Sequence, residues 1–170
     1  FEDIVKNGNK DIKLVSLRNI AKYKSSSEMN NAILKDYNLQ VNWGLPYIEE
    51  KCKKNKIEII KTENNKIWIE IKSYRQSYAM CPVSWCIQNS LNDYNSHILR
   101  NEEQRQYICY DFNKNKRDKL SIVGITIDSN KDILHIFNFH NVSVCDNVED
   151  LISLDIPSYI ANTPSYMVED

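Results

Sequence analysis

Glycine and proline are scarce in this chain, with three and four copies among 170 residues. The sequence contains no glycine-rich phosphate loop, no G-x-S-x-G motif and no HExxH motif, so it lacks the common signatures of phosphate binding, serine hydrolysis and zinc peptidase chemistry. No apolar run approaches the roughly 18 residues that a membrane span needs, and we expect no membrane partner. The net charge of −1 gives no global attraction to nucleic acid or to a membrane surface.

Cysteine is present, but its pattern does not indicate a disulfide framework. The five cysteines are odd in number and irregularly spaced, which favours a reducing compartment. Cys109 lies within a β-like run and is interpreted as a small buried side chain. The sequence starts at Phe1 without a signal-like segment, so we expect a processed chain or the ordered part of something longer.

The predicted fold class is α+β. Residues 1–55 are expected to form a helical N-terminal part, because Leu14, Leu17 and Ile20 recur at helical spacing and Ser25 opens a start signal for a second helix. A short helix is predicted over residues 46–54.

Residues 56–157 are predicted to form an α+β domain, and residues 158–170 an irregular tail. A β-hairpin over 56–61 and 66–72 should have one buried face, with Trp68 on its polar side. After a connector at 73–83, one long helix over 85–99 should pack on a three-stranded antiparallel meander. The meander strands are predicted at 106–112, 120–128 and 132–141, followed by a closing helix at 147–154. Gly124, inside a strand, indicates close approach by the long helix or its Trp85.

The first candidate for chemistry is a thiol site at Cys86. If Ser84 caps the long helix, Cys86 lies in its first turn, where free N–H groups and the helix dipole lower a thiol pKa. His135 or His140, followed by Asn141, would complete a catalytic set of the kind that thiol peptidases use. The alternative is that Cys86 and His135 are packed core residues. We favour that alternative, because strand alternation places His135 with Ile133, Phe137 and Phe139.

Three other constellations are weaker. Cys81 with Cys86, and His135 with His140, have spacings at the edge of those used for zinc, and no metal or other cofactor is expected.

Asp111 and Asp128 end two neighbouring strands and could form a carboxylate pair, although such residues more often accept turn hydrogen bonds. A nucleic-acid surface would use two basic clusters and Trp68 as a stacking platform; its residues would be Lys53, Lys54, Lys56, Lys116 and Arg117.

The motif order resembles a domain that recurs in tailed-phage genomes. The motifs are Trp85-Cys86-Ile87, Tyr94, the stretch 106–112, the stretch 121–127, and finally His135 and His140-Asn141. A looser version, with a Cys, a Tyr and following strands, is similar to PcfJ-like proteins of plasmids and phages. The resemblance covers about residues 57–141 and implies phage provenance, in a bacterial host cytoplasm or a virion; it carries no established activity.

These observations favour a phage-encoded binding or structural module that acts through protein–protein contacts, because the sequence contains many aromatic residues and no convincing polar constellation. The partner would be another phage protein or a host factor. The leading alternative is a thiol-dependent hydrolase or transferase at Cys86. The second is a nucleic-acid-binding protein.

Overall fold

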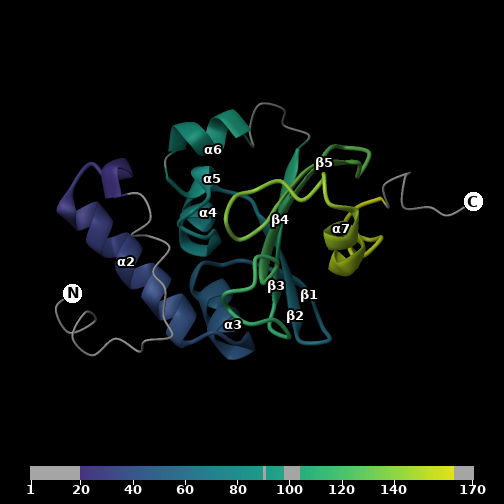
Figure 1. The fold of residues 1–170 in the computed structure, drawn as a ribbon, viewed down its shortest axis with the longest axis horizontal. Coiled ribbons are helices and arrows are strands. Elements are labelled where there is room, and N and C mark those ends of the chain that lie inside the picture. Colours follow the sequence, from purple (N-terminus) through teal and green to yellow (C-terminus); the bar gives the residue numbers. More distant parts are fainter. Residues whose placement is uncertain (1–19, 90, 98–103, 163–170) are drawn as a thin grey trace, which may run out of the picture.

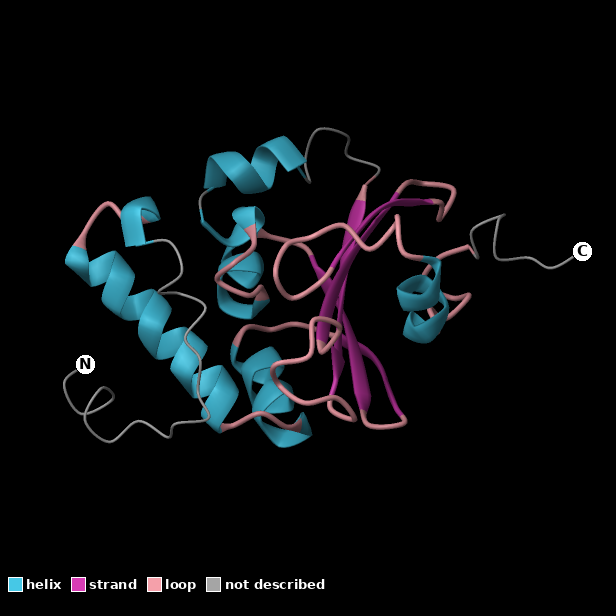
Figure 2. Cartoon of the chain, in the orientation of Figure 1, coloured by secondary structure: helices cyan, strands magenta, loops and turns pink. Residues whose placement is uncertain are grey.

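The computed structural model describes residues 20–89, 91–97 and 104–162. Its centre is one antiparallel sheet with the strand order β1-β2-β3-β4-β5, so every strand pairs with its neighbour in sequence. The α+β class predicted from the sequence is confirmed. Figure 1 and Figure 2 show helices α2 to α6 on one side of the sheet and α7 on the other. The strands are β1 (Ile59–Glu63), β2 (Lys66–Ile71), β3 (Arg105–Asp111), β4 (Ile122–Ile127) and β5 (Ile133–Phe137); the helices are the 3-10 turn η2 (Ile20–Lys22), α2 (Ser26–Val41), α3 (Leu45–Lys54), α4 (Tyr74–Met80), α5 (Cys86–Asn89), α6 (Leu91–His97) and α7 (Val148–Leu154).

The predicted hairpin is formed by β1 and β2. Asn64 and Asn65 connect the strands with φ values of 51° and 60°, the left-handed backbone that two-residue hairpin turns need and that asparagine tolerates well. The prediction of a single buried face is wrong. Side chains on both faces of β2 are buried, and Trp68 is only 4% exposed.

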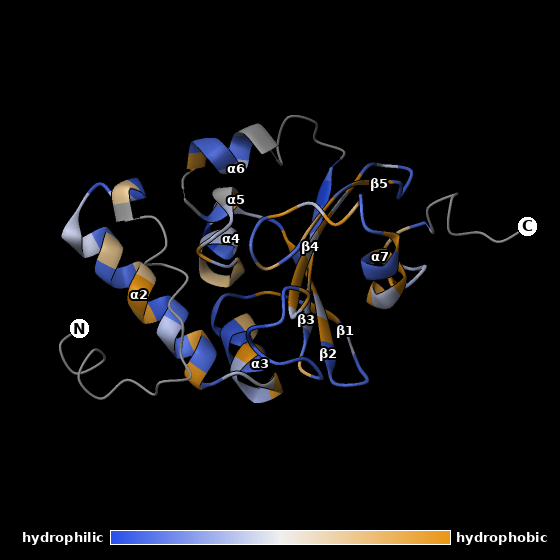
Figure 3. Cartoon of the chain, viewed as in Figure 1, coloured by the Kyte–Doolittle hydropathy of each residue, from blue (hydrophilic) through white to orange (hydrophobic). Residues whose placement is uncertain are grey.

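Burial on both faces arises because the sheet separates two apolar clusters. We call the side covered by α3, α4 and α5 the helix face; its cluster includes Ile67, Ile108 and Trp85. We call the other side the α7 face; its cluster includes Trp68, Cys109 and Leu151. Figure 3 shows apolar residues concentrated on the strands, whereas polar residues dominate the turns and α6.

Several helix starts follow from capping residues. Ser25 caps α2 by accepting a hydrogen bond from the Glu28 N–H at 3.1 Å, as its sequence indicates. The closing helix is confirmed as α7, where Asn147 accepts from the Asp150 N–H at 3.0 Å. Helix α4 lies where only a connector was predicted. Ser73 accepts from the Gln76 N–H at 3.2 Å, so a Ser-x-x-Gln start signal was present in the sequence.

Within the helix predicted over residues 85–99, the structure describes two helical stretches, α5 and α6, on either side of residue 90. Leu91 is 52% exposed, whereas Ile87 and Tyr94 are buried. Ser84 does not cap α5; its hydroxyl donates to the Phe139 carbonyl at 2.5 Å.

The expected close approach at Gly124 is confirmed. A Cβ at this position would lie 2.6 Å from Trp85 Cη2 and 2.9 Å from Gln106 Nε2. The Trp85 indole N–H donates to the Asn138 carbonyl at 2.9 Å, which fixes the ring above the glycine. Trp85 therefore joins the helix layer, the centre of β4 and the loop after β5.

The N-terminal helices pack on the same core. Ile48 and Cys52 of α3 belong to the helix-face cluster, and Leu39 of α2 packs against it. Ile160 and Ala161, within the predicted tail, are buried on the α7 face. The helix signal at Leu14 and Leu17 lies outside the described residues. Among the described helices, none combines the length and apolar character required to cross a membrane.

Candidate functional site

The predicted thiol site is only partly visible. Cys86 is the first residue of α5, so its place in a first helical turn is confirmed, but its side chain lies outside the described part of the chain. His135 is exposed on β5, an edge strand, where its ring stacks on Phe137 at 5.7 Å. The interpretation of His135 as a core residue is therefore wrong.

The predicted common face of the last strand is wrong for Ile133. The β4–β5 register shifts between Thr126 and Ile127, and such an irregularity breaks strict alternation. The shift places Ile133 on the α7 face, whereas Phe139 belongs to the helix-face cluster, on the side of Gly124 and Thr126, which pair with Phe137 and His135.

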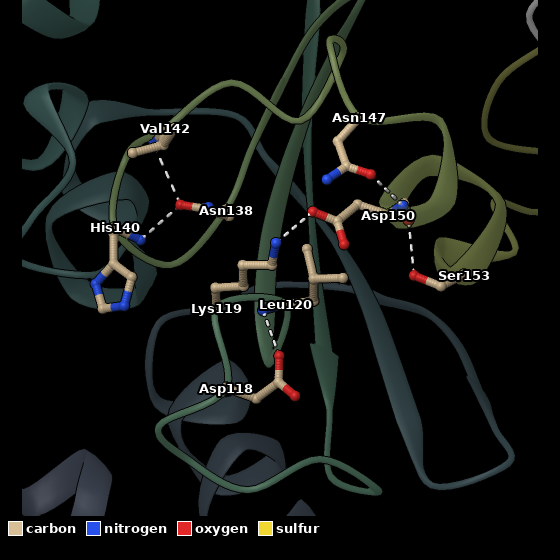
Figure 4. A network of polar contacts seen from close by, with 9 residues as sticks. All are labelled: Asp118, Lys119, Leu120, Asn138, His140, Val142, Asn147, Asp150 and Ser153. Atoms are coloured by element: carbon tan, nitrogen blue, oxygen red, sulfur yellow. Dashed lines mark hydrogen bonds and ion pairs between the residues drawn. The ribbon is translucent and has the colours of Figure 1, made fainter.

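His140 and Asn141 belong to a tight turn that Asn138 organises. The Asn138 side-chain oxygen accepts from the backbone N–H groups of His140 at 2.9 Å and Val142 at 3.1 Å, as Figure 4 shows. Asn141 has φ of 62°, and its N–H donates to the Asn138 carbonyl at 3.0 Å. This geometry gives Asn141 a turn-forming role, since asparagine tolerates the left-handed conformation. The catalytic combination of Cys86 with these residues stays a prediction.

The other predicted constellations separate in the structure. Asp111 and Asp128 lie far apart, because β3 and β4 are antiparallel and their C-terminal ends therefore lie at opposite ends of the strand pair. Asp128 instead accepts from the N–H groups of Asn130 and Asp132, the turn role expected for a strand-end aspartate. Among the described side chains, no group of three or more His, Cys, Asp and Glu could hold a metal ion.

The predicted nucleic-acid residues are divided between surface and core. Trp68 is buried on the α7 face, so it cannot serve as a stacking platform. Lys53, Lys54 and Lys56 are exposed at the end of α3, as is Arg117 in the β3–β4 loop. Lys116 is half-buried, and its ammonium donates to the Gln40 carbonyl at 3.3 Å.

A small cavity lies between α2, α3 and the α4–α5 connection, and sequence reasoning missed it. The cavity has room for one water molecule. Its lining brings together residues that are distant in sequence, including Lys35, Asp36, Lys51, Cys81, Tyr110 and Phe139.

Two lysines give this cavity its unusual electrostatics. Burial lowers the pKa of Lys35 to about 7, and the positive charge of Lys51 adds to the decrease. Burial also lowers the pKa of Lys51. The Lys35 ammonium donates to the Tyr78 carbonyl and lies 5.1 Å from the centre of the Tyr78 ring. Lys51 likewise lies over an aromatic ring, 5.6 Å from the centre of Tyr47, a contact that favours a cation.

Buried hydrogen bonds connect the segments that form the cavity floor. The hydroxyl of fully buried Tyr110 donates to the Met80 carbonyl at 2.5 Å, and burial raises the Tyr110 pKa well above its usual value. Cys81 is completely buried, with its sulfur 3.4 Å from the Ser77 hydroxyl. Ser77 in turn donates to the Ile87 carbonyl at 2.9 Å, which ties α4 to α5.

One signal for the cavity was available in the sequence. Ile48, Lys51 and Cys52 have the spacing of one helix face, so Lys51 belongs with two buried residues and not with its neighbours Lys53 and Lys54. No such signal marks Lys35, because its position depends on how α2 docks against α4. No protein-family model, no curated protein and no solved structure matches this chain.

Proposed function

We propose that the protein is a binding module that acts through contacts with another protein. The observation that carries this proposal is an exposed tyrosine beside a lysine that lines the cavity, Tyr78 of α4 and Lys35 of α2. We call these two residues, together with Leu34, which precedes Lys35 on α2, the α2–α4 patch. Leu34 and Tyr78 are each 45% exposed, and the Lys35 ammonium lies against the Tyr78 ring. A tyrosine held beside a cation is typical of residues that contribute most to protein interfaces.

The size of the cavity supports recognition at the surface. Pockets for small molecules occupy several hundred Å³, whereas this cavity has room for one water. A binding partner would therefore rest on the α2–α4 patch and insert at most one end group.

The resemblance of residues 57–141 to a tailed-phage domain supports a phage or phage-derived origin. In that setting the partner is another phage protein or a host factor, met in a bacterial cytoplasm or in a virion. Mass spectrometry of purified virions tests the virion alternative, because a structural component would be present in a fixed ratio to the major capsid protein. Its absence from virions, together with its presence in infected cells, would favour a host-factor partner.

A photo-crosslinking amino acid at position 78 tests the protein-binding proposal directly. In cells that contain the protein, we expect a single crosslinked product of defined mass. The matched control places the same amino acid at position 159, where the native tyrosine is 41% exposed, has the Lys61 ammonium 5.3 Å from its ring centre and precedes residues buried on the α7 face. Equal crosslinking from both positions, or none from position 78, would contradict the proposal.

A further inference from the structure

Three positively charged side chains meet around the cavity beside the α2–α4 patch. Lys35 and Lys51 line it directly. The Lys22 ammonium donates to the carbonyl of Val83, another lining residue, at 2.7 Å. The charges of both Lys51 and Lys22 oppose protonation of Lys35.

Within the described ranges, no carboxylate oxygen lies within 4.0 Å of the ammonium group of any of these three lysines. Their positive charges are therefore not neutralised by ion pairs there. The titratable groups around Lys35 are Lys22 from η2, Asp36 from α2, Lys51 from α3 and Cys81 after α4; Tyr110 of β3 also lines the cavity. Asp36 favours the charged form of Lys35, but burial and Lys51 outweigh it. A further negative group would relieve the repulsion.

We infer that this cavity is a carboxylate-binding site that receives one Asp or Glu side chain of the protein partner, held between Lys35 and Lys51. The inference rests on the proposed function and specifies the chemistry of the partner. Because only one water-sized group fits inside, one oxygen of the carboxylate enters, the other oxygen lies at the mouth, and the rest of an acidic segment lies over Leu34 and Tyr78. Arranged in this way, the apolar surface supplies contact area and the lysines supply selectivity for negative charge.

Binding at this site depends on pH, because Lys35 must be protonated to attract a carboxylate. With a pKa of about 7 in the free protein, most Lys35 side chains are charged at pH 6 and roughly a tenth at pH 8. A bound carboxylate favours the charged form and raises the Lys35 pKa by linkage. The affinity for an acidic segment therefore falls by up to roughly tenfold between pH 6 and pH 8.

The test measures binding of a capped hexaglutamate peptide to the full chain by calorimetry at pH 6 and pH 8, with capped hexaglutamine as the uncharged peptide. Lys35→Gln and Lys51→Gln should each weaken hexaglutamate binding at least tenfold at pH 6, since each removes a charge-assisted contact. Lys53→Gln and Lys54→Gln remove the same charge from exposed positions on α3 and should change the affinity less than about twofold. Circular dichroism verifies that each variant is folded, and loss of the buried charge in Lys35→Gln should not destabilise it.

Equal weakening by Lys51→Gln and Lys53→Gln would overturn the inference, because it would show attraction by net charge alone. Tighter binding of inorganic phosphate than of hexaglutamate, lost in Lys35→Gln, would overturn the assignment of a carboxylate. Crosslinking from position 78 without any binding of hexaglutamate would overturn this inference and leave the proposed function intact. Hexaglutamate binding that depends on Lys35, without crosslinking from position 78, would instead contradict the proposed function and leave a carboxylate site.

Discussion

The two faces of the sheet bury similar apolar residues but differ in how polar groups are handled. On the helix face, buried polar groups join separate segments: the Trp85 indole donates to the Asn138 carbonyl, the Tyr110 hydroxyl to the Met80 carbonyl, and the Ser77 hydroxyl to the Ile87 carbonyl. On the α7 face, the cluster around Trp68, Ile125 and Leu151 is apolar. The Lys119–Asp150 pair at 2.6 Å, seen in Figure 4, lies at its exposed margin.

This difference shows which face specifies geometry and which supplies bulk burial. Directional bonds require particular atoms at particular places, so the helix face tolerates little change in shape. Apolar contacts are non-directional, so the α7 face should accept changes that preserve volume. The cavity with Lys35 and Lys51 occurs on the helix-covered side, where its walls are held by these bonds.

The largest expected contrast comes from single-carbon changes at neighbouring positions of β4. Gly124→Ala on the helix face should reduce the free energy of unfolding by about 3 kcal/mol, because the added methyl would overlap Trp85. Ile125→Val on the α7 face should cost only about 1 kcal/mol. Urea denaturation measures both values. In a Trp85→Phe background the cost of Gly124→Ala should fall by at least about 1 kcal/mol; an unchanged cost would show that Trp85 is not the obstacle.

This contrast also marks what sequence could predict. Gly124 lies inside a run of β-branched residues, which predicted that a neighbour approaches closely, and Trp85 at the start of a helix was correctly named as that neighbour. Both features could be read from short stretches of sequence, because a glycine within a strand indicates close approach by a neighbour. Trp68 was misplaced because alternation in one strand cannot reveal a second covering layer, here supplied by α7. His135 was misplaced because edge position and register shift arise from strand pairing. The Lys35 cavity depends on five separate segments, and no local pattern encodes that arrangement.

The second contrast is between Lys35 and the buried thiols, which give the stability of the fold opposite dependences on pH. The Lys35 pKa of about 7 is below the ordinary 10.5, so between these values the unfolded chain binds more protons and stability rises with pH. Burial raises the pKa of Cys52 to about 11 and of Cys109, on the α7 face, to about 12. The thiols have the opposite effect: their contribution is complete below the pKa of an unfolded thiol, about 8.5, and is lost as the pH rises above it.

Stability should therefore increase by about 1–2 kcal/mol from pH 7.0 to pH 8.5 and then decrease. Urea denaturation at half-unit intervals measures the curve. Lys35→Met should abolish the rise below pH 8.5, whereas Lys53→Met, at an exposed position of α3, should retain it. A rise that persists in Lys35→Met would assign the pH dependence to another group. Cys109→Ala should leave the rise intact and reduce the decrease at higher pH.

The smallest contrast uses two buried tyrosines of β3 whose side chains point to opposite faces. Tyr110→Phe removes the hydroxyl that donates to the Met80 carbonyl and leaves a buried acceptor, so it should cost about 1.5 kcal/mol. Tyr107→Phe, on the α7 face, removes a hydroxyl that interacts with the exposed Arg105 and should cost less than about 0.5 kcal/mol. Chemical denaturation gives both values, and hydrogen exchange at Met80 and Cys81 would report loosening of the cavity wall in Tyr110→Phe alone. Equal costs for the two substitutions would mean that the directional bonds of the helix face add no more to stability than the apolar packing of the α7 face.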